Sequence, residues 1–352
     1  MKVITKMEMK PGMVLGEDIT FQGNIIFKAD SIVDANVIEK LKHYSAIMCV
    51  TIKEDIDFAT THHEKIRFDQ DFIEFEKRYN ECLLLYKGIM LSYLGTGRGI
   101  PDSNLIKIYN DVFEKIPSSF KLLDYLYNMK PNEDEMTYTQ GLNAALLAGA
   151  LADWISMDEY NKKILILCGF YYDIGKWMLP HEILWKPGKL TEDEYRRVKD
   201  HPVMGYTLLR TNYNLNEHVK NAAIMHHERF DGSGYPYHMK GDKIDIFARY
   251  IAIIDTYIAM ASPRTYRSAF TPLQIIGHFE ANMEKYDNEL LIPVMKRIAD
   301  AQIGTNVMLN DNSVWEVFII HPNKFSRPLL KNENNEILDL FTTPHLDIFK
   351  NV

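Results

Sequence analysis

The pattern of hydrophobic and polar positions changes twice along the chain. Up to about residue 55, short apolar runs separated by turn residues predict strands at KVITKM, MVLGEDI, NIIFKA and AIMCVTI. Between them, DANVIEKLKHY has apolar residues at helical spacing, and Asp34 is placed to cap its first turn. The beginning of the chain therefore predicts a small β-rich module with one helix, which we assign to residues 1–60.

The spacing becomes helical from about residue 64. KIRFDQDFIEFEKRYNECLLLYKGIML, NLIKIYNDVFEKI and FKLLDYLYNM carry apolar residues three and four apart, with GTGRGIPDS between the first two. The glycines of GTGRG could cradle a phosphate, but no strand precedes them and no Lys-Ser/Thr follows, which favours a turn between helices. This helical connector, residues 61–130, has two interpretations: a stalk through which two copies of the chain form a homodimer, or helices that pack on the following domain.

The strongest helical pattern lies in residues 131–302. Alanine-rich TQGLNAALLAGALADWIS is suited to close helix packing, and IFARYIAIIDTYIAMA is apolar over most of its length. In residues 303–352 the pattern returns to strands, and NVMLNDNSVWEVFIIH is expected to form a hairpin that turns at NDNS. The predicted fold class is mainly α, with a helical domain between a β-rich N-terminal module and a short β C-terminal tail.

Composition narrows the classes of protein. The chain has 352 residues, is 46% hydrophobic and 25% charged, and carries a formal net charge of -8, so a globular fold is expected and long nucleic acid is not. Its three cysteines are widely separated, which favours reduced thiols over a disulfide framework. No apolar run reaches the roughly 18 residues of a membrane span, and the first residues lack the apolar core of a signal peptide. A cytoplasmic protein is expected.

Acidic and histidine residues recur in the helical domain beside apolar segments. They are Asp173, His201, His226, His227 and Asp255. Burial of a lone carboxylate is costly unless it is paired, hydrogen-bonded or bound to a cation. Each residue also has an ordinary structural explanation: the histidines could begin or end helices, and Asp255 could pair with Arg249 or Arg264. Together, and with a glycine-rich turn directly after the histidine pair, they favour a metal site.

Three long stretches resemble the HD-GYP family, a branch of the HD phosphohydrolase superfamily. They are DIGKWMLPHEILWKPGKLTEDEYRRVKDHPVMGYTLL, HHERFDGSGYP and IIDTYIAMASPRTYR. The resemblance extends from about residue 133 to 300 and implies an all-helical catalytic domain. It also implies a phosphodiesterase that hydrolyses the bacterial messenger cyclic di-GMP with two or three iron or manganese ions.

The same resemblance implies a set of metal ligands, and the chain departs from it in one part. The positions that match are Asp173, His201, His226, His227 and Asp255. Gln140 and Tyr172 stand where the family has histidines, and Met136 stands where trinuclear members have a glutamate, so no third metal is expected. An amide oxygen is a weak ligand for a transition metal, and a neutral tyrosine with a pKa near 10 is weaker still.

One iron or manganese ion is therefore expected, and a second site is expected to be damaged or empty. The first would be held by Asp173, His201, His226 and His227. The second would have to use Gln140, Tyr172, Asp173 and Asp255.

Further residues are implied to contact the ligand. Lys176, with Asp173 one of two expected catalytic residues, would lie beside the phosphates, and Arg264 and Arg267 of RTYR would lie near phosphate or guanine groups. The GYP loop would shape the pocket and contact a protein partner, although a turn shaped only for folding stays open as an explanation. Its residues are Asp231, Gly232, Gly234, Tyr235 and Pro236.

Three functions are compatible with this pattern. The favoured one is a cyclic di-GMP signalling protein that binds a cyclic dinucleotide with weak or absent phosphodiesterase activity, because two metal-binding histidines are replaced. The alternatives are an active metal-dependent cyclic di-GMP phosphodiesterase and a non-catalytic protein-interaction scaffold. A phosphohydrolase acting on a nucleotide monophosphate is less favoured, because HHERFDGSGYP is typical of the cyclic-dinucleotide branch.

Overall fold

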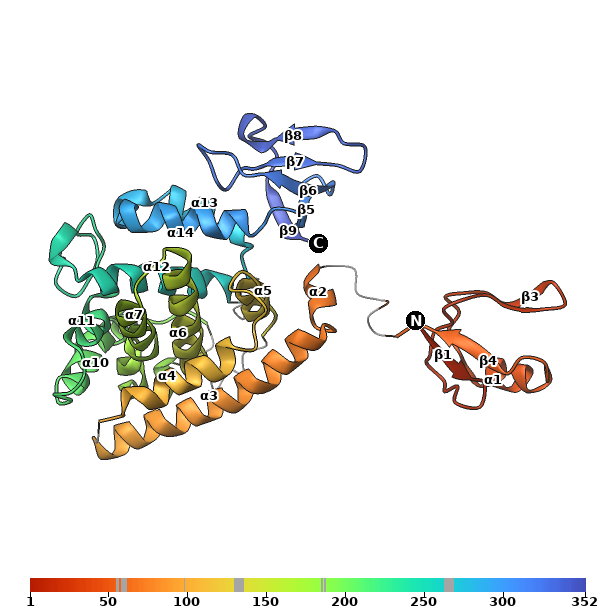
Figure 1. Ribbon diagram of the computed structural model, residues 1–352, viewed down its shortest axis with the longest axis horizontal. Helices are drawn as coiled ribbons and strands as arrows, with labels where there is room; N and C mark the ends of the chain where they lie inside the picture. The colour runs from red at the N-terminus through yellow and green to blue at the C-terminus, as the bar shows by residue number, and fades with distance from the viewer. Residues whose placement is uncertain are drawn as a thin grey trace. The chain divides into compact units, whose positions relative to one another are not determined.

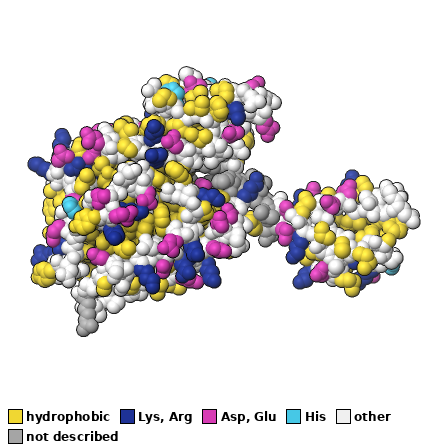
Figure 2. All heavy atoms as spheres, in the orientation of Figure 1, with side chains coloured by type: hydrophobic (Ala, Val, Ile, Leu, Met, Phe, Trp, Pro, Cys, Tyr) yellow, Lys and Arg dark blue, Asp and Glu magenta, His cyan; other side chains and the backbone are white. Residues whose placement is uncertain are grey.

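The computed structural model describes most of the chain, in two compact units, Met1–Phe68 and Asp69–Val352 (Figure 1). The described residues are 1–54, 57, 62–97, 99–129, 136–184, 186, 188–262 and 269–352, without the side chains of His62, His63 and Met136. Within them, no helix combines the length and the apolar character needed to cross a bilayer. On the face seen in Figure 2, acidic and basic side chains are interspersed.

The first unit is the expected β-rich module. Strand β1 (Lys2–Thr5) pairs antiparallel with β4 (Cys49–Ile52), and β2 (Ile19–Phe21) pairs with β3 (Asn24–Phe27). Helix α1 (Ala35–Lys42) begins where the sequence predicted, because the Asp34 carboxylate accepts a hydrogen bond from the Val37 amide. The short helix α2 (His62–Ile66) lies near the end of this unit.

One predicted strand of this module is wrong in part. In MVLGEDI, only Ile19 belongs to a strand, while Val14 and Leu15 form isolated bridges to Ile32 and Ile52. The two neighbours bridge to different segments, so no continuous ladder forms. Leu15 still points inward and is fully buried in the core of the module.

The second unit begins with helices α3 (Gln70–Thr96), α4 (Asp102–Phe113) and α5 (Lys121–Asn128). Helix α3 ends at Gly97, whose φ of +66° is the left-handed conformation that glycine adopts at little cost, so GTGRG does contain a turn between helices. The buried face of α3 packs against α4 and α6. Pairing of two copies through these helices stays a prediction.

Five helices form the centre of the second unit, where they lie side by side (Figure 1). They are α6 (Met136–Trp154), α7 (Glu159–Tyr171), α10 (His201–Leu209), α11 (Glu217–Met225) and α12 (Ile246–Ala261). Gly169 permits a close approach of α7 to α6, because a Cβ there would lie 2.5 Å from the backbone of Ala145. The short elements η3 (Ile174–Met178), α8 (His181–Leu184), α9 (Glu192–Lys199) and η4 (Gly241–Lys243) connect these helices.

The chain ends with a small sheet attached to two further helices, α13 (Pro272–Glu280) and α14 (Asn288–Asp300), which η5 (Met283–Lys285) joins. The sheet is antiparallel, in the order β8-β7-β6-β5-β9. Its strands are β5 (Asn306–Leu309), β6 (Val314–Ile319), β7 (Leu329–Lys331), β8 (Ile337–Asp339) and β9 (Ile348–Asn351), with η6 (Leu340–Thr342) after β8. The β5–β6 hairpin was expected, and the mainly α fold class with β-rich ends is confirmed.

Candidate metal centre

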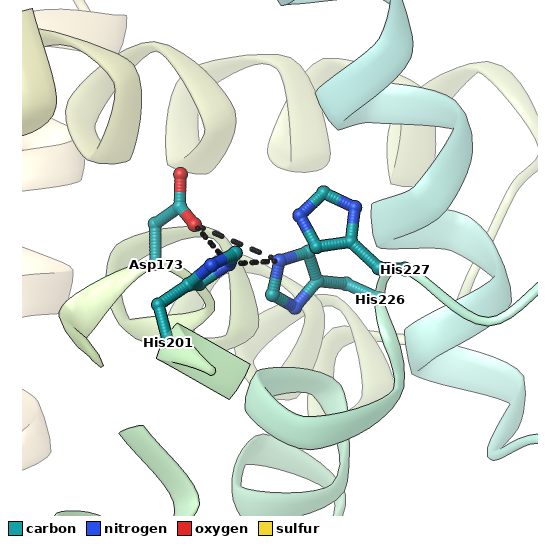
Figure 3. Close-up of side chains that lie close together, drawn as sticks. All are labelled: Asp173, His201, His226 and His227. Carbon is teal, nitrogen blue, oxygen red and sulfur yellow. Dashed lines mark hydrogen bonds and ion pairs between the residues drawn. The ribbon is translucent and has the colours of Figure 1, made fainter. Parts of the chain in front are cut away.

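Three helix ends meet at one point in the second unit (Figure 3). Asp173 follows α7, His201 is the first residue of α10, and His226 and His227 follow α11. Gly175 allows Asp173 and His201 to come together, because a Cβ at position 175 would lie 1.9 Å from the carbonyl oxygen of His201. Any larger residue would separate η3 from α10, and with it Asp173 from His201.

The four side chains bring their ligand atoms within 4.8 Å of one another. Asp173 Oδ1 lies 3.2 Å from His201 Nε2 and 3.6 Å from His226 Nε2, and these two nitrogens are 3.2 Å apart. Asp173, His201 and His226 are at most 4% exposed, whereas the His227 side chain is 15% exposed. We refer to Asp173, His201, His226 and His227 as the four-ligand cluster.

Backbone hydrogen bonds orient two of the imidazoles. His201 Nδ1 donates to the carbonyl oxygen of Val198 at 2.6 Å, and His226 Nδ1 donates to the carbonyl oxygens of Ala222 and Ala223 at 3.1 and 3.0 Å. In neutral imidazoles this leaves lone pairs on both Nε2 atoms. They point at each other and at Asp173 Oδ1, a buried oxygen that accepts no hydrogen bond.

The protonation states favour a cation at this point. Burial lowers the pKa of His201 and, aided by the charges of neighbouring histidines, lowers that of His227 well below its usual value. Burial works to raise the pKa of Asp173, but the Lys176 ammonium, 2.5 Å from Oδ2, outweighs it and holds the pKa well below the usual range. Neutral imidazoles and a carboxylate are the forms that bind metals, so the cluster fits a divalent ion.

Tyr172 and Asp255 form a second, different arrangement beside the cluster. The Tyr172 hydroxyl donates to Asp255 Oδ1 at 3.2 Å, and its ring lies edge-on to the His226 ring at 5.0 Å. Burial, together with the charges of Asp173 and Asp255, raises the pKa of Tyr172 well above 10, so the proton stays on the oxygen. Asp255 Oδ2 is 4.0 Å from His227 Nδ1, and Asp255 does not belong to the four-ligand cluster.

The other positions expected around the second sub-site are only partly described. Gln140 is buried in α6, and Met136 begins that helix without a described side chain. The ordinary explanation that paired Asp255 with Arg249 is wrong, because the Arg249 guanidinium binds Asp287 at 2.9 Å and Asp242 at 3.0 Å. Arg264 and Arg267, expected to contact the ligand, lie outside the described residues.

The GYP loop, Asp231 to Pro236, begins five residues after His226. Asp231 accepts a hydrogen bond from the Ser233 amide at 2.8 Å, and Gly232 has a φ of +87°. A Cβ at Gly234 would lie 2.3 Å from the Arg229 amide nitrogen, so this close turn also requires glycine. The Tyr235 ring, next to Pro236, stacks on the His227 imidazole at 4.7 Å and thereby connects the loop to the cluster.

Sequence reasoning missed the role of Glu228. Its side chain is 2% exposed, and its two carboxylate oxygens accept hydrogen bonds from the Tyr237 amide at 2.7 Å and the Met239 amide at 3.0 Å. Glu228 therefore holds the segment that follows the GYP loop against the end of α11. The sequence did carry a signal for this role, because Glu228 directly follows two histidines and a carboxylate next to a buried site needs hydrogen-bond donors.

Comparisons with known proteins agree with this geometry. Residues 125–290 match the HD_5 family, described as an HD domain. The chain is 40% identical over 126 residues to the cyclic di-GMP phosphodiesterase response regulator RpfG of Xanthomonas campestris, which covers 36% of this chain and 33% of that protein. It is 30% identical over 198 residues to the cyclic di-GMP phosphodiesterase PA4108 of Pseudomonas aeruginosa, covering 56% and 48%.

A further relative has a different named substrate. The chain is 32% identical over 171 residues to the 3'3'-cGAMP-specific phosphodiesterase 1 of Vibrio cholerae, covering 48% of this chain and 39% of that protein. The chain thus spans between a third and a half of the length of these curated relatives. Among solved structures, Bd1817, an HDG"Y"P protein from Bdellovibrio bacteriovorus, shares the fold with a TM-score of 0.51 at 13% identity, covering 84% of this chain and 99% of that one.

Proposed function

Because this chain belongs to the HD-GYP family of HD-domain proteins, we propose that it is a signalling protein that binds a cyclic dinucleotide at a one-metal centre and hydrolyses it weakly or not at all. The observation that carries the proposal is the contrast between two neighbouring sets of side chains. Three histidines and Asp173 bring their ligand atoms to one point, whereas the Tyr172 hydroxyl donates a hydrogen bond to Asp255 beside it.

The four-ligand cluster is the proposed place of the metal. Its nitrogen-rich donor set with one carboxylate suits iron or manganese better than magnesium. Asp173 Oδ1 faces the proposed ion while Lys176 binds Oδ2, so the carboxylate is fixed from its far side. A divalent ion bound here would polarise a phosphoryl oxygen and lower the pKa of a bound water.

The side chains around Asp255 support the absence of an efficient second site. A metal there would compete with the Tyr172 hydroxyl for the Asp255 carboxylate, and Tyr172 can supply no anionic oxygen near neutral pH because its pKa is raised well above 10. Gln140, on α6, offers only an amide. Two metal ions about 3.5–4 Å apart are the usual requirement for efficient phosphodiester hydrolysis by such centres, so loss of one predicts slow turnover.

The groups proposed to hold the dinucleotide are cationic. Lys176 is next to the cluster and only 18% exposed, which suits a lysine that meets a phosphate at the edge of a buried centre. Arg264 and Arg267 keep their proposed role toward phosphate or guanine groups. Both cyclic di-GMP and 3'3'-cGAMP are candidates, because both occur in the names of relatives.

Metal content and ligand binding test the proposal directly. Protein prepared anaerobically with iron or manganese is expected to contain about one ion per chain by elemental analysis. Calorimetry with cyclic di-GMP and with 3'3'-cGAMP should give binding to the metal-loaded protein, with product formation close to that of an Asp173→Ala control. Two ions per chain with rapid hydrolysis would support the active phosphodiesterase, and no heat with either dinucleotide would leave the protein-interaction scaffold.

Restoration of the second sub-site is the sharper experiment. The double variant Gln140→His, Tyr172→His supplies two imidazoles and removes the hydroxyl that occupies Asp255. We expect metal content to rise from about one to about two ions per chain and hydrolysis to rise by about 100-fold, because the second ion stabilises the leaving oxygen. Unchanged metal content and unchanged rate in a folded double variant would contradict the half-site explanation.

A further inference from the structure

We propose that Tyr86 of α3 is a positioning residue for the metal centre, because its hydroxyl holds the turn of chain that carries Asp173. Tyr86 precedes residues 125–290, the part that matches the HD domain, so the family match assigns it no role. The inference rests on the proposed metal-dependent function only for its effect on metal affinity, and its effect on the turn can be measured separately.

The first support is a hydrogen bond at the end of α7. The Tyr86 hydroxyl donates to the carbonyl oxygen of Phe170 at 2.5 Å in a fully buried position. The last four carbonyls of an α-helix find no partner within the helix and need one from elsewhere. Phe170 is the last residue but one of α7, and Asp173 follows three residues later. Tyr86 therefore caps the helix end from which the metal ligand projects.

The second support is that Tyr86 contacts the chain on both sides of Asp173. Its ring lies 5.0 Å from the ring of Phe170, before the ligand, and 6.0 Å from the ring of Trp177, after it. Trp177 also packs on Tyr138 at 4.6 Å. The turn between Phe170 and Trp177 is thus fixed at its two ends by one side chain of a helix that lies outside the family match.

The third support comes from α6. A Cβ at Gly141 would lie 2.4 Å from the Tyr86 hydroxyl oxygen, so the residue directly after Gln140 leaves room for this hydroxyl. The space is specific to Tyr86 among the aromatic residues that recur every seven positions on the buried face of α3. Those residues are Phe72, Tyr79, Tyr86 and Tyr93.

The other two tyrosines provide a contrast. Tyr79 donates to Asn143 Oδ1 at 2.6 Å, and Tyr93 donates to the carbonyl oxygen of Leu208 at 3.4 Å. Neither of these two hydrogen bonds goes to the turn that carries Asp173. Tyr79 is also almost fully buried on the same helix, two turns before Tyr86, so Tyr79→Phe removes an equivalent hydroxyl without touching the metal ligand.

The experiment compares Tyr86→Phe with Tyr79→Phe in the full chain. Hydrogen exchange of the amides of residues 171–177 is measured in the metal-free proteins, and Mn²⁺ affinity is measured by calorimetry. We expect Tyr86→Phe to speed exchange in this segment and to weaken Mn²⁺ binding by about 10-fold, the lower range for partners that orient metal ligands. Tyr79→Phe should change the exchange rates and the Mn²⁺ affinity by less than about twofold, even if it lowers the unfolding midpoint as much as Tyr86→Phe does.

Equal effects of the two substitutions would overturn the proposal, because both hydroxyls would then act on stability alone. If the wild-type chain binds no Mn²⁺, the proposed function fails, but the exchange comparison still decides whether Tyr86 holds the turn. Should Tyr86→Phe not fold, Gly141→Ala tests the same contact, since its methyl group displaces the hydroxyl while the tyrosine remains. Slow exchange at residues 171–177 in folded Gly141→Ala would likewise overturn the proposal.

Discussion

The two halves of the candidate site differ in how their carboxylates are satisfied. In the four-ligand cluster, backbone carbonyls accept hydrogen bonds from Nδ1 of His201 and of His226. The Nε2 lone pairs and Asp173 Oδ1 therefore face one another without a proton between them. Around Asp255 the reverse holds, because the Tyr172 hydroxyl keeps its proton and donates a hydrogen bond to the carboxylate. The lone pairs of the four-ligand cluster therefore suit a cation, whereas the Asp255 carboxylate already accepts a hydrogen bond without one.

The proposed loss of one ion is compatible with a stable fold. A buried carboxylate without a partner is costly, and a tyrosine in place of a histidine removes that cost when the metal is absent. On the proposed function, the tyrosine would do more than remove a ligand, because it also gives Asp255 a hydrogen-bond partner. No such partner faces Asp173 Oδ1, which is why we propose that the four-ligand cluster binds the cation.

The largest effect should come from removing the carboxylate of the cluster. In Asp173→Asn the shape of the side chain stays, but its charge and the free Oδ1 lone pair are lost, so Mn²⁺ affinity should fall by about 100-fold or more. Calorimetry measures the change, with Asp193→Asn, an exposed carboxylate on α9, as the matched control. Undiminished affinity in Asp173→Asn would mean that the metal binds elsewhere.

The next effect concerns the GYP loop, which contacts the cluster through the stacking of Tyr235 on His227. Glu228→Gln replaces one of two acceptors by an NH₂ group that faces a backbone N–H, so the free energy of unfolding should fall by about 2 kcal/mol. Mn²⁺ affinity should fall several-fold, because Tyr235 then no longer holds the His227 ring. Urea unfolding measures the change in stability, and calorimetry measures the change in Mn²⁺ affinity. Glu182→Gln, at an exposed position of α8, should change neither quantity.

The comparison also shows what the sequence could predict. The fold class followed from periodicity, because long apolar helices between β-rich ends leave few alternatives. The residues of the cluster were singled out as acidic and histidine residues beside apolar segments, the family resemblance implied their role as ligands, and the structure brings Asp173, His201, His226 and His227 together. For the C-terminal sheet, the β5–β6 hairpin was predicted with its turn, whereas SRPLL and EILDLF, which overlap β7 and β8, carry too short a pattern to fix their pairing.

Contacts between distant segments could not be predicted. Tyr172 was recognised as a departure, but its hydrogen bond to Asp255 joins residues 83 positions apart and depends on how α7 packs against α12. The same limit applies to Tyr86 and Phe170, which are 84 positions apart. The heptad spacing of the α3 tyrosines is visible in the sequence, yet nothing in it says which hydroxyl meets the end of α7.

The smallest expected effect isolates the Tyr172 side of the comparison. Tyr172→Phe removes the donor to Asp255 and should lower the free energy of unfolding by about 1.5 kcal/mol at pH 8, as expected for a hydrogen bond to a charged group. Mn²⁺ affinity of the four-ligand cluster should stay within about twofold of wild type, because no ligand atom changes. A large loss of affinity would show that the two halves are not separable.

The pH dependence of this difference tests whether Tyr172 keeps its proton. Its pKa is raised well above 10 in the folded chain, whereas the unfolded chain titrates near 10, so its contribution to stability is complete below pH 10 and declines as the pH rises further. Phenylalanine has no such contribution to lose, and the gap between wild type and Tyr172→Phe should therefore narrow from pH 9 to about pH 11. Urea unfolding of the metal-free proteins at both pH values measures the gap. A gap of constant size would mean that Tyr172 titrates alike in the folded and unfolded chains, and the proposed occupation of Asp255 by a retained proton would be wrong.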